Sequence, residues 1–168
     1  MIVLDTDHIS ILQHTGNSAA QTLSQRLAES ADRDIATTVV TVEEQMRSWL
    51  SLIARYRDAE QQATYYEQLI RFVRFFNTWR ILSLDRTAIS ELTRLRKSKV
   101  RVASTDLKIA AITLSRGGLL LSRNLDDFRK IPGLRVEERH LAIDRFRAAQ
   151  RPRGLPMRIG RWDPCAGT

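Results

Sequence analysis

Short apolar segments alternate with helix-forming segments along most of this chain of 168 residues, and this alternation limits the folds that it can adopt. Strands that are separated by helices pair in parallel, because each helix returns the chain to the same edge of the sheet. The expected strands are Ile2–Leu4, Ile35–Thr38, Trp79–Leu82, Leu119–Ser122 and Leu134–Val136. The sequence therefore predicts an α/β fold, a three-layer sandwich with a central, mainly parallel sheet of four to five strands.

The segments between these strands have the apolar spacing of helices. Two long ones, around residues 42–53 and 65–76, are expected to form an antiparallel hairpin. Shorter helices are expected at residues 7–13, 18–31 and 85–95. A further helix is expected to be capped by Ser104 and Thr105 and to end at Gly117 and Gly118, because glycine is favoured just beyond a helix C-terminus.

The length and charge of the chain bound its organisation. Residues 1–149 fit one domain, and residues 150–168 form a basic tail with three of the four prolines, which we expect to be flexible. The formal net charge of +8 favours a polyanionic partner, nucleic acid rather than membrane. No segment approaches the roughly 20 apolar residues of a membrane span, and the single cysteine, Cys165, has no disulfide partner. A cytoplasmic protein is predicted.

Carboxylates recur where the expected strands end or the next helices begin. The carboxyl ends of parallel strands meet along one edge of a sheet, where ligands usually bind. Acids gathered there would repel one another unless a cation neutralised them, and oxygen ligands suit Mg²⁺ or Mn²⁺. The four carboxylates in such positions are Asp5, Glu44, Asp106 and Asp127.

Each of these acids also has an ordinary structural explanation. Asp5 can cap the following helix, although Asp7 is the better candidate for that cap. Glu44 follows Thr41 at the spacing of a capping box, and Asp106 is favoured by the dipole of the helix that it begins. Only the recurrence at equivalent topological positions favours a shared site.

Two choices stay open at this point. The apolar stripe of the helix places Glu43 closer to the core than Glu44, so spacing alone does not decide between these neighbours. Asn124 and Asp127 lie in one expected turn, where asparagine and aspartate are common. Either residue can supply the fourth position of the site.

Several of these segments together are similar to a known family. They are Leu4–Ser10, Val40–Glu44 and Asp106–Ala111, the last of which continues into Leu120–Phe128 and Gly133–Leu134. With them the chain resembles the PIN-domain family, and within it the VapC-type toxins of bacterial toxin–antitoxin pairs. The resemblance covers residue 1 to about residue 145, and Gln45, Ser48 and the long basic tail depart from the family pattern.

The resemblance implies a metal-dependent endoribonuclease that hydrolyses RNA phosphodiester bonds with Mg²⁺ or Mn²⁺. It implies that Asp5 and Asp106 bind the metal directly, while Glu44 and Asp127 bind through water or orient the attacking water. Asn124 can occupy the variable fourth acidic position. The resemblance further implies inhibition by a VapB-type antitoxin and a homodimer.

Two other functions are compatible with parts of this sequence. A PIN-like module that binds RNA or protein without cutting is compatible with Asn124 at a metal position. Leu4–Asp7 is also similar to haloacid-dehalogenase-type phosphatases, in which the first aspartate is the nucleophile and the second a general acid. The pattern of those enzymes has threonine or valine at the position of Ile9, and this sequence lacks their later Gly-Asp-x-x-x-Asp motif.

Overall fold

The computed structural model of the chain describes residues 1–14, 16 and 18–138. The predicted tail at 150–168, its boundary with the preceding domain, and Cys165 all lie outside these residues. No helix in the described ranges is long and apolar enough to cross a membrane.

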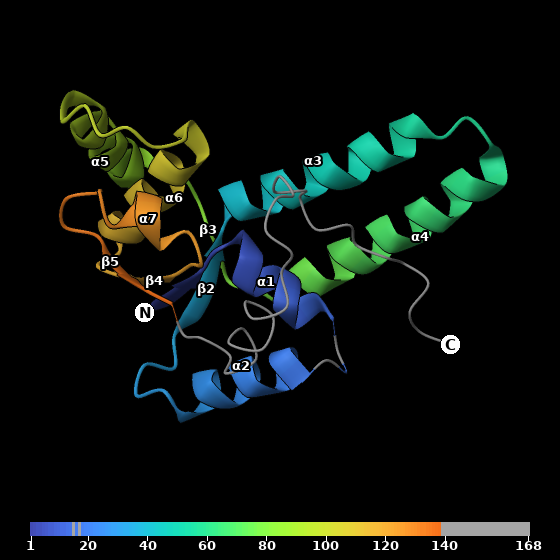
Figure 1. Cartoon of the computed structure of the whole chain (residues 1–168), viewed down its shortest axis with the longest axis horizontal. Helices are drawn as coiled ribbons and strands as arrows, with labels where there is room; N and C mark the ends of the chain where they lie inside the picture. The colour runs from blue at the N-terminus through green and yellow to red at the C-terminus, as the bar shows by residue number, and fades with distance from the viewer. Residues whose placement is uncertain (15, 17, 139–168) are drawn as a thin grey trace, which may run out of the picture.

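Five parallel strands form one sheet in the order β3-β2-β1-β4-β5 (Figure 1). The strands are β1 (Ile2–Leu4), β2 (Ile35–Thr38), β3 (Ile81–Leu82), β4 (Leu119–Leu121) and β5 (Arg135–Glu137). The predicted fold class is therefore confirmed, and every pairing within the described sheet is parallel. The third strand is two residues shorter than expected, because Trp79 still belongs to the turn after the preceding helix, while Arg80 joins the sheet only through its carbonyl, which accepts from the Thr37 amide at 3.0 Å.

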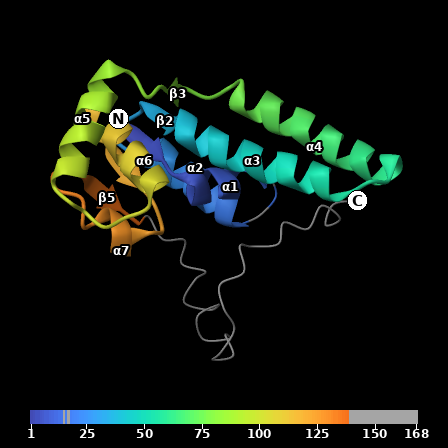
Figure 2. The same cartoon turned by 90° about the horizontal axis from the view of Figure 1, so that it is seen from above.

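Seven helices surround this sheet in the described part of the chain. They are α1 (Thr6–Gln13), α2 (Ser18–Glu29), α3 (Val39–Arg55), α4 (Ala59–Phe76), α5 (Arg86–Lys97), α6 (Ser104–Ser115) and α7 (Leu125–Phe128). The long helices α3 and α4 lie side by side and extend well beyond the sheet (Figures 1 and 2). The predicted helical hairpin is confirmed, while α7 replaces what was expected to be a simple turn.

Alternation along β1 divides the core into two layers. The side chain of Val3 faces the layer that contains α5, α6 and α7, where it joins Leu95, Ile112 and Phe128. Ile2 and Leu4 face the opposite layer, with residues from α1, α2 and α4 that include Leu23, Leu27, Phe72 and Phe76. Because adjacent residues of a strand point to opposite faces, a three-residue strand can anchor both layers.

The registers align the carboxyl ends of the three central strands. Leu4 pairs with Thr37 on one side and with Leu121 on the other. The next residue along each strand therefore lies at the same edge of the sheet, and the amide of Asp5 extends the ladder to the carbonyl of Leu121 at 3.0 Å. Helices α1 and α3 begin directly at this edge.

Two helix caps differ from those predicted. Thr38, not Thr41, is the N-cap of α3, and its Oγ1 accepts a hydrogen bond from the amide of Thr41 at 3.1 Å. Helix α6 already includes Ser104, so its N-cap is Ala103, which provides no side-chain cap. In both cases the helix begins earlier than expected.

Candidate functional site

Asp5 lies at the end of β1 with only 8% of its side chain exposed. One carboxylate oxygen accepts a hydrogen bond from the Thr6 amide at 2.7 Å and so caps α1. The other oxygen accepts a hydrogen bond from the Ser122 hydroxyl at 2.6 Å, across 117 residues of sequence. The capping role proposed for Asp5 is real, but it engages only half of the carboxylate.

The pKa of Asp5 is raised from 3.8 to about 7, chiefly by burial and also by the nearby charges of Asp7 and Glu44. The hydrogen bonds from Ser122 and Thr6 act in the opposite direction. A buried carboxyl group whose neighbours are also acidic is destabilised as an anion. Its environment would favour a bound cation for the same reason.

Glu44 approaches this edge from α3. Its Oε2 accepts a hydrogen bond from the Thr6 hydroxyl at 2.6 Å, which links the first turn of α1 to the second turn of α3. The capping-box role proposed for Glu44 is wrong, since Thr38 caps the helix. Glu43 points elsewhere and forms an exposed ion pair with Arg47. Of the two neighbours, the structure therefore places Glu44 beside the other acids.

Asp106 and Asp127 meet through one amide group. The Nδ2 of Asn124 donates to Asp106 Oδ2 at 3.2 Å and to Asp127 Oδ2 at 3.3 Å. Lys130 also pairs with Asp127, at 2.6 Å. Asp106 belongs to the first turn of α6 and Asp127 to α7, so the N-termini of two helices present these acids. Asn124 and Asp127 are therefore both adjacent to Asp106.

The pKa values of these two acids move in opposite directions. Burial raises the pKa of Asp106 to about 6, with further contributions from the charges of Glu44 and Asp127. Hydrogen bonds from Lys130 and Asn124 lower the pKa of Asp127 instead. The charges of Glu44 and Asp127 both act on Asp106, so acids from three separate elements interact electrostatically at this edge.

Asp7 has a different environment from Asp5. One of its oxygens lies 2.6 Å from the amide and 2.7 Å from the Nδ1 of the buried residue His8, and the other accepts from the amide of Arg123 at 2.6 Å. It is not the helix cap that was expected, because Asp5 fills that position. Donors hold both oxygens of Asp7, which makes it a poor general acid for the phosphatase interpretation.

Some residues that organise the edge were not predicted. Ser122 is completely buried, donates to Asp5 and accepts from the amide of Asn124 at 3.0 Å. Gln45, noted only as a departure from the family pattern, is buried and donates to Ser10 Oγ at 3.0 Å. A polar residue directly after the apolar run Leu119–Leu121 was the available signal for Ser122.

The chemistry of the donors fits a small divalent cation. Every candidate ligand is an oxygen, and the two acids with raised pKa values are Asp5 and Asp106. Among the described residues, no three histidine, cysteine or acidic side chains form a ready-made ligand set. Mg²⁺ commonly binds through one or two carboxylates and retains several waters, so this arrangement suits it. The assignment of Asp5 and Asp106 as ligands stays a prediction.

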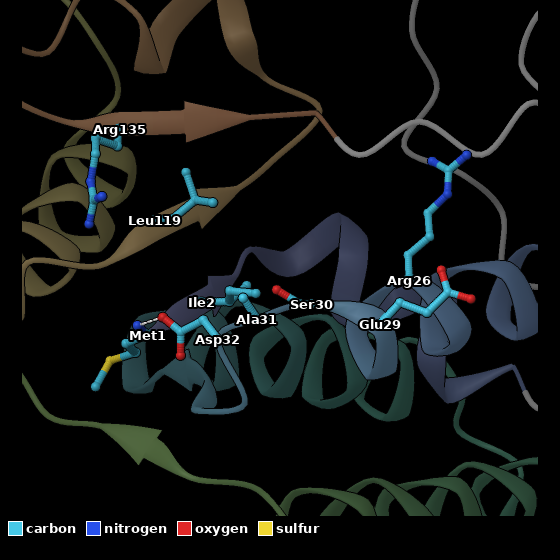
Figure 3. Close-up of a pocket in the computed structure, with 9 residues that line it drawn as sticks. All are labelled: Met1, Ile2, Arg26, Glu29, Ser30, Ala31, Asp32, Leu119 and Arg135. Atoms are coloured by element: carbon cyan, nitrogen blue, oxygen red, sulfur yellow. Dashed lines mark hydrogen bonds and ion pairs between the residues drawn. The ribbon is translucent and has the colours of Figure 1, made fainter.

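A cavity of about 580 Å³ lies at the opposite edge of the sheet (Figure 3). Its lining includes Met1, Ile2, Leu119 and Arg135, at or next to the starts of β1, β4 and β5. Charges of both signs line it, and the Met1 ammonium forms an ion pair with Asp32. None of the predicted site residues belongs to this cavity.

The fold is similar to chains of solved toxin–antitoxin complexes. A chain of VapBC-1 from nontypeable Haemophilus influenzae is 17% identical with a TM-score of 0.63, and the match covers 82% of this chain and 98% of that one. A chain of VapBC2 from Rickettsia felis, bound to a DNA fragment from the promoter, is 18% identical with a TM-score of 0.62, over 83% of this chain and 100% of the other. The similarity to a VapC-type PIN-domain fold is confirmed.

A more similar sequence occurs among these structures, at a lower TM-score. A chain of VapBC-5 from Mycobacterium tuberculosis is 25% identical with a TM-score of 0.51, over 83% of this chain and 97% of the other. No model of a protein family matches the sequence. No curated protein matches it either.

Proposed function

We propose that this chain is the toxin of a toxin–antitoxin pair and acts as a metal-dependent endoribonuclease in the cytoplasm. The single observation that best supports this is the gathering of carboxylates from separate elements at one edge of the sheet, where burial and then their mutual repulsion raise the pKa of Asp5 to about 7 and that of Asp106 to about 6. Strongly perturbed carboxyl groups at a strand edge are typical of functional sites. The similarity to chains of VapBC complexes supports the choice of class.

In this proposal Asp5 and Asp106 hold a Mg²⁺ or Mn²⁺ ion between β1 and α6. When bound, the ion supplies positive charge that activates water and stabilises charge developing on the phosphate. Glu44 and Asp127 orient the attacking water from α3 and α7. Ser122 and Thr6 fix the positions of Asp5 and Glu44 through hydrogen bonds of 2.6 Å each.

The partner in the proposal is an antitoxin protein that covers the α3–α4 hairpin. Met46 and Leu50 on α3, and Tyr66, Ile70 and Val73 on α4, expose between 37% and 54% of their surfaces. Exposed apolar residues on a projecting element mark protein interfaces. Several of the solved structures that are similar to this chain are VapBC complexes. The predicted homodimer stays a prediction, which the mass of the purified protein in solution would test.

Cleavage of a structured RNA by the purified full chain tests the proposed activity. We expect cleavage with Mg²⁺ or Mn²⁺, none after addition of a chelator, and none in Asp5→Asn or Asp106→Asn under any of these conditions. Cutting that persists in either variant would contradict the assignment. Metal-dependent heating curves provide a readout besides activity, since both variants should lose the stabilisation by Mg²⁺.

The same experiment distinguishes the proposed nuclease from a module that binds RNA without cutting it. A PIN-like module that only binds RNA would retain the RNA with and without a chelator and would release no fragments. Asn124 keeps this alternative open, because an amide is a weaker metal ligand than a carboxylate. Asn124→Asp should increase cleavage if the site is catalytic and short of one acid.

A further inference from the structure

The end of α5 and the loop that joins it to α6 carry a run of cations that the proposed mechanism does not use. Arg96, Lys97, Lys99 and Arg101 all expose their side chains, and none forms an ion pair within the part of the chain that the structure describes. We call these four residues the α5–α6 basic strip. No aspartate or glutamate occurs between Glu91 and Asp106, so no local acid offsets this charge.

The strip leads directly into the acidic edge. Arg101 precedes Asp106 by five residues and Lys99 precedes it by seven, which limits their Cα separations to about 18 Å and about 25 Å. Figure 1 shows this loop running from the end of α5 to the start of α6. Helix α6 in turn contacts both α3 and α7, which carry Glu44 and Asp127.

Helix stabilisation explains only part of the strip. Cations in the last turn of a helix interact favourably with its dipole, and this accounts for Arg96 and Lys97 at the end of α5. The effect falls off within one turn. Lys99 and Arg101 lie beyond the end of the helix, so its dipole does not account for their charges.

The backbone at Lys99 has a conformation that favours glycine over lysine. Ser98 is the C-cap of α5, so Lys99 occupies the following position, where glycine is usual. Its φ of 55° is the only positive φ of a non-glycine residue in the described ranges. Lysine in this conformation is less favourable than glycine. The chain therefore keeps a cation at a position where folding alone favours its replacement.

We infer that the α5–α6 basic strip binds the phosphate backbone of RNA and directs it to the acidic edge. This inference rests on the proposed function for the identity of the nucleic acid. A strand whose reacting phosphate lies at Asp106 would pass the strip within its next few nucleotides. The acids cannot attract such a polyanion themselves, so a separate cationic surface is needed beside them.

Binding of a fluorescent single-stranded RNA to the full chain in a chelator tests the inference without cleavage. We expect Lys99→Gly/Arg101→Gln to weaken binding on the order of tenfold at low salt and to lower the slope of log affinity against log salt by about 1.4. The matched control is Arg71→Gln/Arg74→Gln, which removes the same charge from the exposed surface of α4. The control should leave the slope unchanged.

Lys99→Gly alone separates binding from folding. It should melt at the same temperature as the unaltered chain or higher, since glycine suits the local φ, and yet bind RNA more weakly. Equal losses in the strip and control variants, or no loss in the strip variant, would overturn the inference. Failure of the unaltered chain to cleave RNA with Mg²⁺ would instead count against the proposed nuclease, and weakened binding by the strip variant would still support the strip.

Discussion

The two edges of the sheet treat charge in opposite ways. At the edge formed by the amino ends of the strands (the amino edge), residues of positive and negative charge line the cavity, and the Met1 ammonium pairs with Asp32. At the edge formed by the carboxyl ends of the strands, Asp5 and acids from α3, α6 and α7 influence one another, and Lys130 pairs with one of them, Asp127. The same fold thus satisfies its charges at one edge and concentrates like charges at the other. Such concentration is costly, which favours a functional explanation.

The largest expected effect contrasts two adjacent glutamates on α3. Glu44→Gln should reduce RNA cleavage by roughly 100-fold or more, because it removes the carboxylate that faces the site. Glu43→Gln should leave cleavage within about twofold, since this side chain pairs with Arg47 on the surface. Initial rates at saturating Mg²⁺ would measure both. Equal losses of cleavage rate in the two variants would contradict the assignment of Glu44, and not Glu43, to the site.

A second prediction concerns stability against pH without metal. The folded-state pKa of Asp5 is raised from 3.8 to about 7, so the stability that it contributes is complete below pH 3.8 and lost as the pH rises through 7. Asp5→Asn should therefore match the unaltered chain near pH 4 and exceed it by roughly 2–4 kcal/mol at pH 8. Urea unfolding in a chelator would measure this.

Asp127→Asn provides the control of opposite sign. The pKa of Asp127 is lowered by its hydrogen bonds, so its contribution is present above its ordinary pKa and lost in acid. This variant should gain no stability at pH 8. If the free energy of unfolding of Asp5→Asn changed with pH in parallel with that of the unaltered chain, Asp5 would not be the acid with the raised pKa.

An intermediate effect is expected at the buried hydroxyl that joins β4 to Asp5. Ser122→Ala removes the donor to Asp5 and the acceptor for the Asn124 amide, and we expect a loss of about 1–3 kcal/mol. Unfolding at pH 5 and pH 8 should show the larger loss at pH 8, where Asp5 is ionised. Ser115→Ala, which loses a bond only to a helix carbonyl, is the comparison.

The smallest effect is expected at the amino edge. Arg135 lines the cavity and donates to the carbonyl of Gly117 from an exposed position. Arg135→Gln should change stability by less than about 0.5 kcal/mol and leave cleavage unchanged. A marked loss of activity would show that the two edges are not functionally separate.

The sequence predicted the fold better than it predicted the contacts within the site. Alternating strands and helices were sufficient for the parallel sheet, because their connectivity admits few topologies. Spacing did not distinguish Glu43 from Glu44, since neighbouring residues of a helix differ by about 100° in direction and the start of α3 was misplaced. Once Thr38 is the cap, Glu44 lies close enough to accept from Thr6.

Other features depended on long-range contacts that no local pattern contains. Asp7 was expected to cap α1, but its carboxylate instead holds the Arg123 amide from the far side of the sequence. The amide of Asn124 bridges Asp106 and Asp127, although the turn itself contains only one of these acids. Local residue preferences identify turns and caps, whereas such bridges arise only after the strands are aligned.

The hydrogen bond between Asp5 and Ser122 also determines when this edge can form during synthesis. Asp5 is synthesised first, and Ser122 follows 117 residues later. Strand β1 can pair early with β2, but its second neighbour, β4, and the turn with Asn124 become available only near the end of the described chain. A nascent chain that stalls before β4 would lack an assembled acidic edge, so any activity must await synthesis of β4 and the turn that follows it.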